Sequence, residues 1–117
     1  MNIIFGDALE QLPDNYTVLE LDTFRRPDNT RFTAYCVVES MPLTELPQAQ
    51  HWLKIHQDLM TNYRAREWNY CEHAIEGLSG RWGGEADSFY TNLLDRINNF
   101  RNNPPSADWD GSILKIR

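Results

Sequence analysis

Long hydrophobic runs, cysteine and positive charge are all scarce in this 117-residue chain. No apolar run approaches the roughly 20 residues that a membrane-spanning helix needs. The first residues lack the basic flank and long apolar core of a signal peptide. The two cysteines, Cys36 and Cys71, lie far apart, and without an export signal such thiols are ordinarily reduced and buried. We therefore expect a soluble, cytoplasmic protein without membrane association.

Basic residues are outnumbered, with 11 Lys and Arg against 17 Asp and Glu and a net charge of -6. Proteins that bind nucleic acid or an anionic membrane need a clustered positive field. The acids concentrate in residues 1–50, which hold eight acids and three bases. This charge distribution argues against nucleic acid as a partner.

Patterns typical of catalysis are also missing. No glycine-rich loop joins a strand to a helix at phosphate-binding spacing, and Ser79 and Ser88 have no His–Asp arrangement to activate them. Asp108 and Asp110 form a carboxylate pair around Trp109, but an adjacent glycine favours turn-making over acid–base chemistry. We expect no enzymatic activity and no cofactor.

Four residues have side chains that could ligate a metal ion: His51, His56, Cys71 and His73. His51 and His56 are five residues apart, whereas ligands on one helical face are spaced by four. Cys71 and His73 point about 200° apart around a helix. The spacing therefore favours a core position for Cys71 and predicts no metal site.

The first 40 residues predict strands. Residues 2–5 are apolar and β-branched and are expected to form a buried strand, followed by a short helix over 6–12 that Pro13 stops. Residues 16–24 and 31–38 are rich in strand formers and flank a polar turn, which predicts an antiparallel hairpin.

From about residue 48 the apolar period changes to that of amphipathic helices. Glycines at positions 80, 83 and 84 separate the second predicted helix from the third, and Pro104 and Pro105 end the third. Trp109 follows, and its size predicts that the tail folds back and docks its indole. The three apolar stripes are Trp52, Ile55, Leu59 and Tyr63; Trp68, Cys71, Ile75 and Leu78; and Phe89, Leu93, Leu94 and Ile97.

Several of these segments are similar to one protein family. Residues 3–4, 8–13 and 19–22, followed by Tyr35, resemble the end of the catalytic domain of class III adenylate/guanylate cyclases. Residues 63–68, 94–97 and 100–111, with their Pro-Pro and Asp-Trp-Asp-Gly, resemble the carboxy-terminal extension of many bacterial cyclases. That extension is similar to a tetratricopeptide-type helix pair with a capping helix.

The resemblance implies ancestry and fold without activity. The family holds two cations with aspartates on early strands, and the residues that match here begin after that region. The helix that carries the family's catalytic Asn and Arg is also missing from the match. In the hairpin turn, the family's Lys-Gly dipeptide is replaced by residues 25–28, Arg-Arg-Pro-Asp.

Together these patterns predict an α+β fold in a single domain over residues 1–117. Residues 1–40 form a strand–helix–hairpin unit, and residues 47–117 form a tetratricopeptide-like unit of three helices with a docked tail. Because a lone hairpin is marginal in water, the helices are expected to cover one face of the strands.

Partner-binding candidates come from loops and exposed aromatic residues. Trp82 lies in a loop between Arg81 and a Gly-Gly pair and is the best candidate for an exposed contact. Tyr70 is a second aromatic candidate, and Arg25 and Arg26 in the hairpin turn are the basic ones. The spacing of Trp52 and Trp68 on apolar stripes favours core positions for both, and Arg64 and Arg66 are expected on a solvated helix face.

The function that follows is a non-catalytic protein-interaction or regulatory module. It would bind a protein partner, a nucleotide cyclase among the candidates, or a second copy, through the helical surface near Trp82 or through an exposed strand edge. One alternative is a small nucleotide-binding protein that uses Arg25, Arg26 and the acidic tail. Another is a structural subunit of a larger assembly, of cellular or viral origin.

Overall fold

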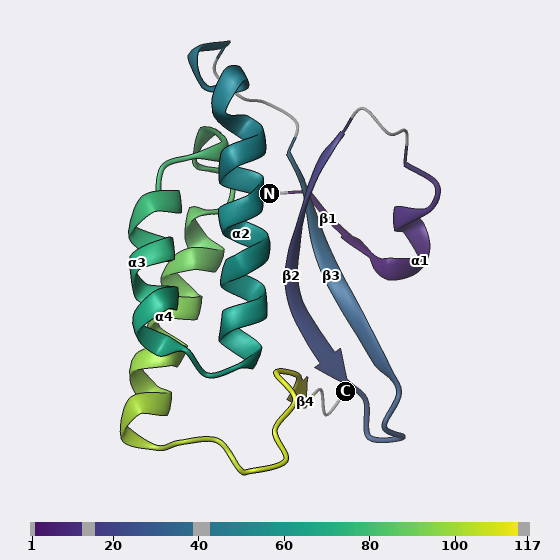
Figure 1. The fold of residues 1–117 in the computed structure, drawn as a ribbon. Coiled ribbons are helices and arrows are strands. Elements are labelled where there is room, and N and C mark those ends of the chain that lie inside the picture. Colours follow the sequence, from purple (N-terminus) through teal and green to yellow (C-terminus); the bar gives the residue numbers. More distant parts are fainter. Residues whose placement is uncertain (1, 13–15, 39–42, 115–117) are drawn as a thin grey trace.

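The computed structural model describes residues 2–12, 16–38 and 43–114. Four strands form one sheet in the order β1-β3-β2-β4, with β1 at Asn2–Phe5, β2 at Thr17–Arg25, β3 at Arg31–Val38 and β4 at Ile113–Leu114. A layer of helices lies on one side of this sheet, and the short helix α1 (Gly6–Leu9) lies on the other (Figure 1). The expected α+β class is confirmed.

The predicted hairpin is confirmed as the centre of the sheet. β2 and β3 pair antiparallel from Thr17 opposite Val38 to Arg25 opposite Arg31, with an irregularity between Glu20 and Thr23. In the turn, the Asp28 carboxylate accepts hydrogen bonds from the Thr30 amide at 2.9 Å and the Thr30 hydroxyl at 2.6 Å. This is the Asx-type turn chemistry that the polar loop predicts.

The strand over residues 2–5 forms, but its predicted burial is wrong. β1 pairs antiparallel with β3 only, so it is an edge strand, and Ile3 and Phe5 are 44% and 49% exposed. The helix expected over residues 6–12 is shorter, because α1 ends at Leu9 and turns follow it. The predicted stop at Pro13 lies outside the described residues.

The three predicted helices are confirmed. The 3-10 helix η1 (Leu43–Gln48) leads into α2 (Ala49–Arg64), which is followed by α3 (Trp68–Leu78) and, after the 3-10 turn η2 (Trp82–Gly84), by α4 (Asp87–Asn102). Among the described residues, no helix is long and apolar enough to cross a membrane.

One core joins the sheet to the helices. Five buried strand residues meet the apolar stripes of the helices, as amphipathic helices over one sheet face require. Cys36 and Cys71 are both free thiols in this core, as expected. The five strand residues are Leu19, Leu21, Ala34, Cys36 and Val38.

The tail after α4 folds back as predicted. The Trp109 ring packs against Tyr63, Trp68 and Phe100 at centroid distances of 5.3, 6.1 and 5.2 Å. The chain then turns at Gly111, and β4 pairs parallel with the end of β2. Sequence reasoning did not predict this fourth strand.

Gly111→Ala is expected to lower the free energy of unfolding by about 1–2 kcal/mol. Gly111 has a φ of +94°, a conformation that costs an L residue about 1–2 kcal/mol. A Cβ at this position would also lie 2.7 Å from Arg64 Cγ. Urea unfolding measures the change. Gly77→Ala is the matched control, because Gly77 lies in α3 with open space around its Cβ position and should be neutral or slightly stabilising. Equal effects of the two substitutions would contradict the described docking of the tail.

Candidate functional site

Trp82, the leading predicted contact residue, is buried. Its exposed fraction is 0%, and its ring packs edge-on against Trp52 at a centroid distance of 6.3 Å. Its backbone has a φ of +58°, a left-handed conformation that costs a bulky residue about 1–3 kcal/mol. The expectation of an exposed Trp82 is therefore wrong, because burial of the indole outweighs the glycine-rich character of its loop.

The Trp82 side chain begins a buried chain of hydrogen bonds. Trp82 Nε1–H donates to Tyr90 Oη at 3.1 Å, and Tyr90 Oη lies 2.9 Å from His56 Nδ1. His56 Nε2 lies 2.6 Å from the carbonyl oxygen of Glu20. Since a carbonyl only accepts, Nε2 carries the proton, and the Tyr90 hydroxyl donates to Nδ1. The chain ties η2, α4 and α2 to strand β2.

His56 is neutral in this arrangement. Burial lowers the pKa of His56 to about 4. A second ring proton would also turn Nδ1 from an acceptor into a donor facing the Tyr90 hydroxyl, which already accepts from Trp82. His56 thus belongs to the core and is closed to solvent, so the chain of bonds holds the fold and offers no accessible acid or base.

The remaining predicted contact residues do not form one site. Arg81 stacks its guanidinium over Trp52 at 4.3 Å, where α3 ends, and Tyr70 is 41% exposed near the start of α3. Arg25 and Arg26 lie at the hairpin end of the sheet (Figure 1). Arg26 covers the Phe32 ring at 4.2 Å and donates to the Thr30 hydroxyl at 3.2 Å.

Arg64 and Arg66 were expected on a solvated face. Arg64 is exposed there, whereas for Arg66 the expectation is wrong. Arg64 forms an ion pair with Glu20, and burial lowers the pKa of Arg64. Arg66 is half-buried and donates to the carbonyl oxygens of Pro105, at 3.3 Å, and of Ser106. The two arginines connect the end of α2 to the sheet and to the returning tail.

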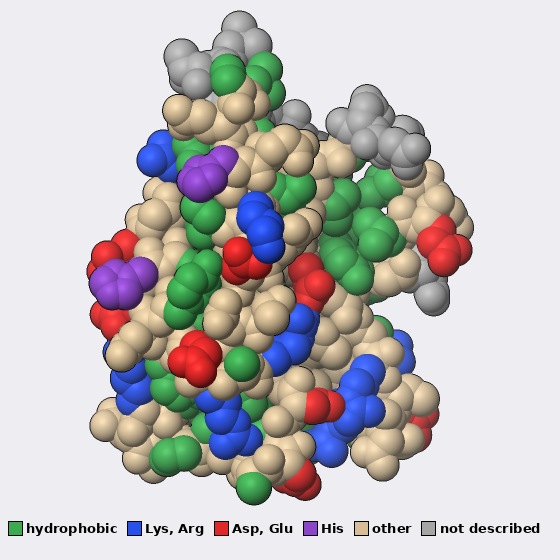
Figure 2. All heavy atoms as spheres, in the orientation of Figure 1, with side chains coloured by type: hydrophobic (Ala, Val, Ile, Leu, Met, Phe, Trp, Pro, Cys, Tyr) green, Lys and Arg blue, Asp and Glu red, His purple; other side chains and the backbone are tan. Residues whose placement is uncertain are grey.

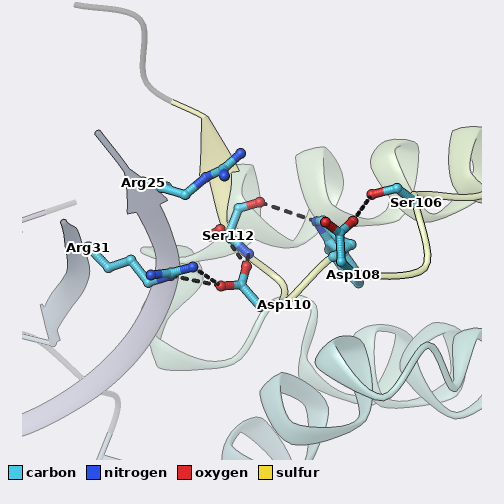
Figure 3. A pocket seen from close by; sticks show the side chains of 7 residues that line it. Arg25, Arg31, Ser106, Asp108, Asp110 and Ser112 are labelled. Carbon is cyan, nitrogen blue, oxygen red and sulfur yellow. Dashed lines mark hydrogen bonds and ion pairs between the residues drawn. The ribbon is translucent and has the colours of Figure 1, made fainter. Parts of the chain in front are cut away.

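A polar pocket of about 220 Å³ lies between the hairpin end and the tail (Figure 3). The structure here brings Arg25 beside the tail acids, whereas Arg26, which the nucleotide-binding alternative also uses, is not among the lining residues. Arg25 Nε is buried and has no hydrogen-bond partner among the described residues, so it offers one N–H donor. The lining residues are Arg25, Arg31, Ser106, Asp108, Trp109, Asp110 and Ser112.

The charges of this pocket are balanced. Asp110 accepts from Arg31 at 2.7 Å, and hydrogen bonds from Ser112, helped by Arg31, lower the pKa of Asp110 to about 2. Asp108 accepts from the Ser106 hydroxyl at 2.7 Å, which with the nearby arginines lowers its pKa. Two cations facing two carboxylates make no net positive field for a phosphate group. The pairing instead fixes the tail to the hairpin.

The four residues considered for a metal site are also dispersed. His56 and Cys71 are buried in the core, whereas His51 and His73 are exposed on α2 and α3. Within the described ranges, no group of three or more metal-ligating side chains occurs.

The two long edges of the sheet differ in protection. On the outer side of β2, Glu20 accepts from His56, and Phe24 and Arg25 pair with β4. On the outer side of β1, no backbone hydrogen bond is formed within residues 2–12, 16–38 and 43–114. In the part of the chain that the structure describes, the outer edge of β1 is therefore unpaired, and we call it the open edge of β1.

The side chains of β1 add apolar surface to this edge. Ile3 and Phe5 lie opposite Cys36 and Ala34, so they project from the helix-covered face of the sheet. The helices cover β2 and β3 there but leave Ile3 and Phe5 largely exposed, and Phe5 contacts only the edge-on ring of Phe32 at 5.6 Å among the ring pairs described. Figure 2 shows further hydrophobic surface between the strands and α1, on the side of the sheet away from the helical layer.

Comparisons with protein-family models, with curated proteins and with solved structures found no match to this chain. The resemblance to the end of a class III cyclase, and the tetratricopeptide-like character of the helices, therefore stay predictions.

Proposed function

We propose that this chain is a non-catalytic protein-interaction module that binds its partner by strand addition at the open edge of β1. The observation that carries the proposal is the contrast between the two sheet edges. At the outer edge of β2, His56 and β4 bond to Glu20, Phe24 and Arg25, whereas among the described residues no backbone hydrogen bond forms on the outer side of β1. An unpaired edge presents a row of N–H and C=O groups to another strand.

The composition of β1 supports this assignment. Natural edge strands are commonly protected by Lys, Pro or inward-pointing charges, and β1 reads Asn-Ile-Ile-Phe without any of them. Its exposed Ile3 and Phe5 would supply apolar contacts beside the backbone hydrogen bonds. The charged groups of the pocket at the hairpin end are largely matched with one another, so they offer weaker support for a ligand-binding function.

Photo-crosslinking in cells of the native source tests the proposal. A benzophenone amino acid replaces Phe5 in one variant and Glu76, an exposed residue of α3, in the control. We expect a covalent protein adduct from position 5 and none from position 76. Mass spectrometry then identifies the adduct as a second copy, a nucleotide cyclase or another protein. No adduct at position 5, or equal yields at both positions, would refute the proposal.

A further inference from the structure

We infer that the partner at this edge is a second copy of the same chain, with β1 of one copy antiparallel to β1 of the other across a two-fold axis. This inference rests on the proposed function and names its partner. Two-fold pairing of one patch with itself is the commonest way in which identical chains associate. It would join the two sheets of four strands into one continuous sheet.

The distribution of charge makes β1 a more favourable site for contact with a second copy than the rest of the surface. The chain has a net charge of -6, so two copies repel each other over much of their surface. β1 has no charged residue. The edge can therefore approach its own copy without placing like charges in the strand pair, and a strand of this composition gives no charge preference for a different partner.

The register follows from which face each side chain occupies. A two-fold axis perpendicular to the sheet keeps both helical layers on the same side, and directly opposed residues of antiparallel strands project from the same face. Ile3 must then oppose Ile3 or Phe5 of the second copy. When Ile3 lies opposite Phe5 of the second copy, Ile4 lies opposite Ile4 on the axis, so each of the three apolar residues faces another apolar residue. When Ile3 lies opposite Ile3, Ile4 faces Asn2 instead, so we choose the pairing with Phe5.

This register covers the exposed apolar surface of β1. Ile3 and Phe5, 44% and 49% exposed in one chain, would each pack on the other residue of the second copy. Aromatic and β-branched residues are favourable cross-strand pairs. The same contact appears twice, because the axis repeats it.

Disulfide trapping tests the register. Ile4→Cys places two thiols opposite each other on the axis, whereas Ile3→Cys places its thiol opposite Phe5. Under mild oxidation we expect Ile4→Cys to form a covalent dimer and Ile3→Cys to form much less. Cys36 and Cys71 are 0% exposed, so the wild-type chain should not crosslink. Equal crosslinking of both variants, or none for a folded Ile4→Cys, would overturn the register.

The mass in solution tests the partner itself. Light scattering should give twice the 13.7 kDa of one chain for the wild type and a single-chain mass for Ile3→Lys, which puts a charge against Phe5 of the second copy. Circular dichroism verifies that Ile3→Lys is folded. A wild-type monomer at all concentrations would overturn the second-copy inference. A different protein crosslinked at position 5 would, in that case, still uphold the proposed function.

Discussion

Replacing Trp82 by alanine is expected to lower the free energy of unfolding by about 3–5 kcal/mol. The indole is fully buried against Trp52, and its removal leaves a cavity and takes the Nε1–H donor from Tyr90. Urea unfolding followed by circular dichroism measures this loss. A surface tryptophan in a flexible loop would change stability by less than about 0.5 kcal/mol.

Two controls separate burial from hydrogen bonding. Trp82→Phe keeps a ring in the core but removes the donor, and should cost about 1–2 kcal/mol for the hydrogen bond alone, plus a smaller loss of packing. Tyr70→Ala changes an aromatic residue that is 41% exposed and should cost far less than Trp82→Ala. If Trp82→Ala were as mild as Tyr70→Ala, Trp82 would be the surface contact that its loop first indicates.

Acid is expected to destabilise the fold through His56, by about 3 kcal/mol between pH 6.5 and pH 4. The folded pKa of about 4 lies below the ordinary value of 6.5, so the unfolded chain takes up this proton first as the pH falls. Protonation in that window therefore favours unfolding. The contribution of His56 to the free energy of unfolding is fully present above pH 6.5, is lost as the pH falls towards 4, and changes no further below pH 4. A difference of one pKa unit between the folded and unfolded chain corresponds to about 1.4 kcal/mol.

A variant without the imidazole isolates this effect. His56→Gln can still donate to the Glu20 carbonyl and accept from Tyr90, but it does not titrate. The stability of the wild type, measured in urea from pH 7 to pH 4.5, should fall with pH more steeply than that of His56→Gln. Titration of His56 by nuclear magnetic resonance near pH 6.5, or identical slopes for both proteins, would contradict the neutral buried histidine.

Local pattern predicted the elements of the fold well. The turn chemistry around Asp28 and the strand formers on each side define the hairpin, and the apolar stripes define α2, α3 and α4. The docking of Trp109 was also predictable, because a double proline must end α4 before a large apolar residue. The hairpin and the helices depend on residues close together in the sequence, and for Trp109 the size of the side chain alone indicated that the tail docks.

Features that depend on distant residues were missed. Trp82 lies between Arg81 and two glycines, and nothing nearby in the sequence indicates that its indole turns inward to Tyr90. His56 lies on the buried stripe of α2, four residues after Trp52 and three before Leu59, and this spacing could have identified it as a core residue. Arg66 was assigned to solvent because its partners lie about forty positions later, in the returning tail.

The open edge was only partly predictable. An unpaired strand edge was expected, but β1 was expected to be buried, because a short apolar strand usually is. Its place at the edge depends on the strand order, in which β4 joins the far side of β2 and leaves β1 outermost. Strand order is set by the whole chain, so the composition of residues 2–5 alone could not reveal it.

Amide hydrogen exchange of residues 2–5, measured at low and at high protein concentration, tests most directly whether β1 pairs with a second copy. The account predicts that the outward-facing amides of β1 exchange quickly in dilute protein and become protected as the concentration rises, while exchange in β2 stays unchanged. Exchange in β1 that is fast at every concentration would contradict it.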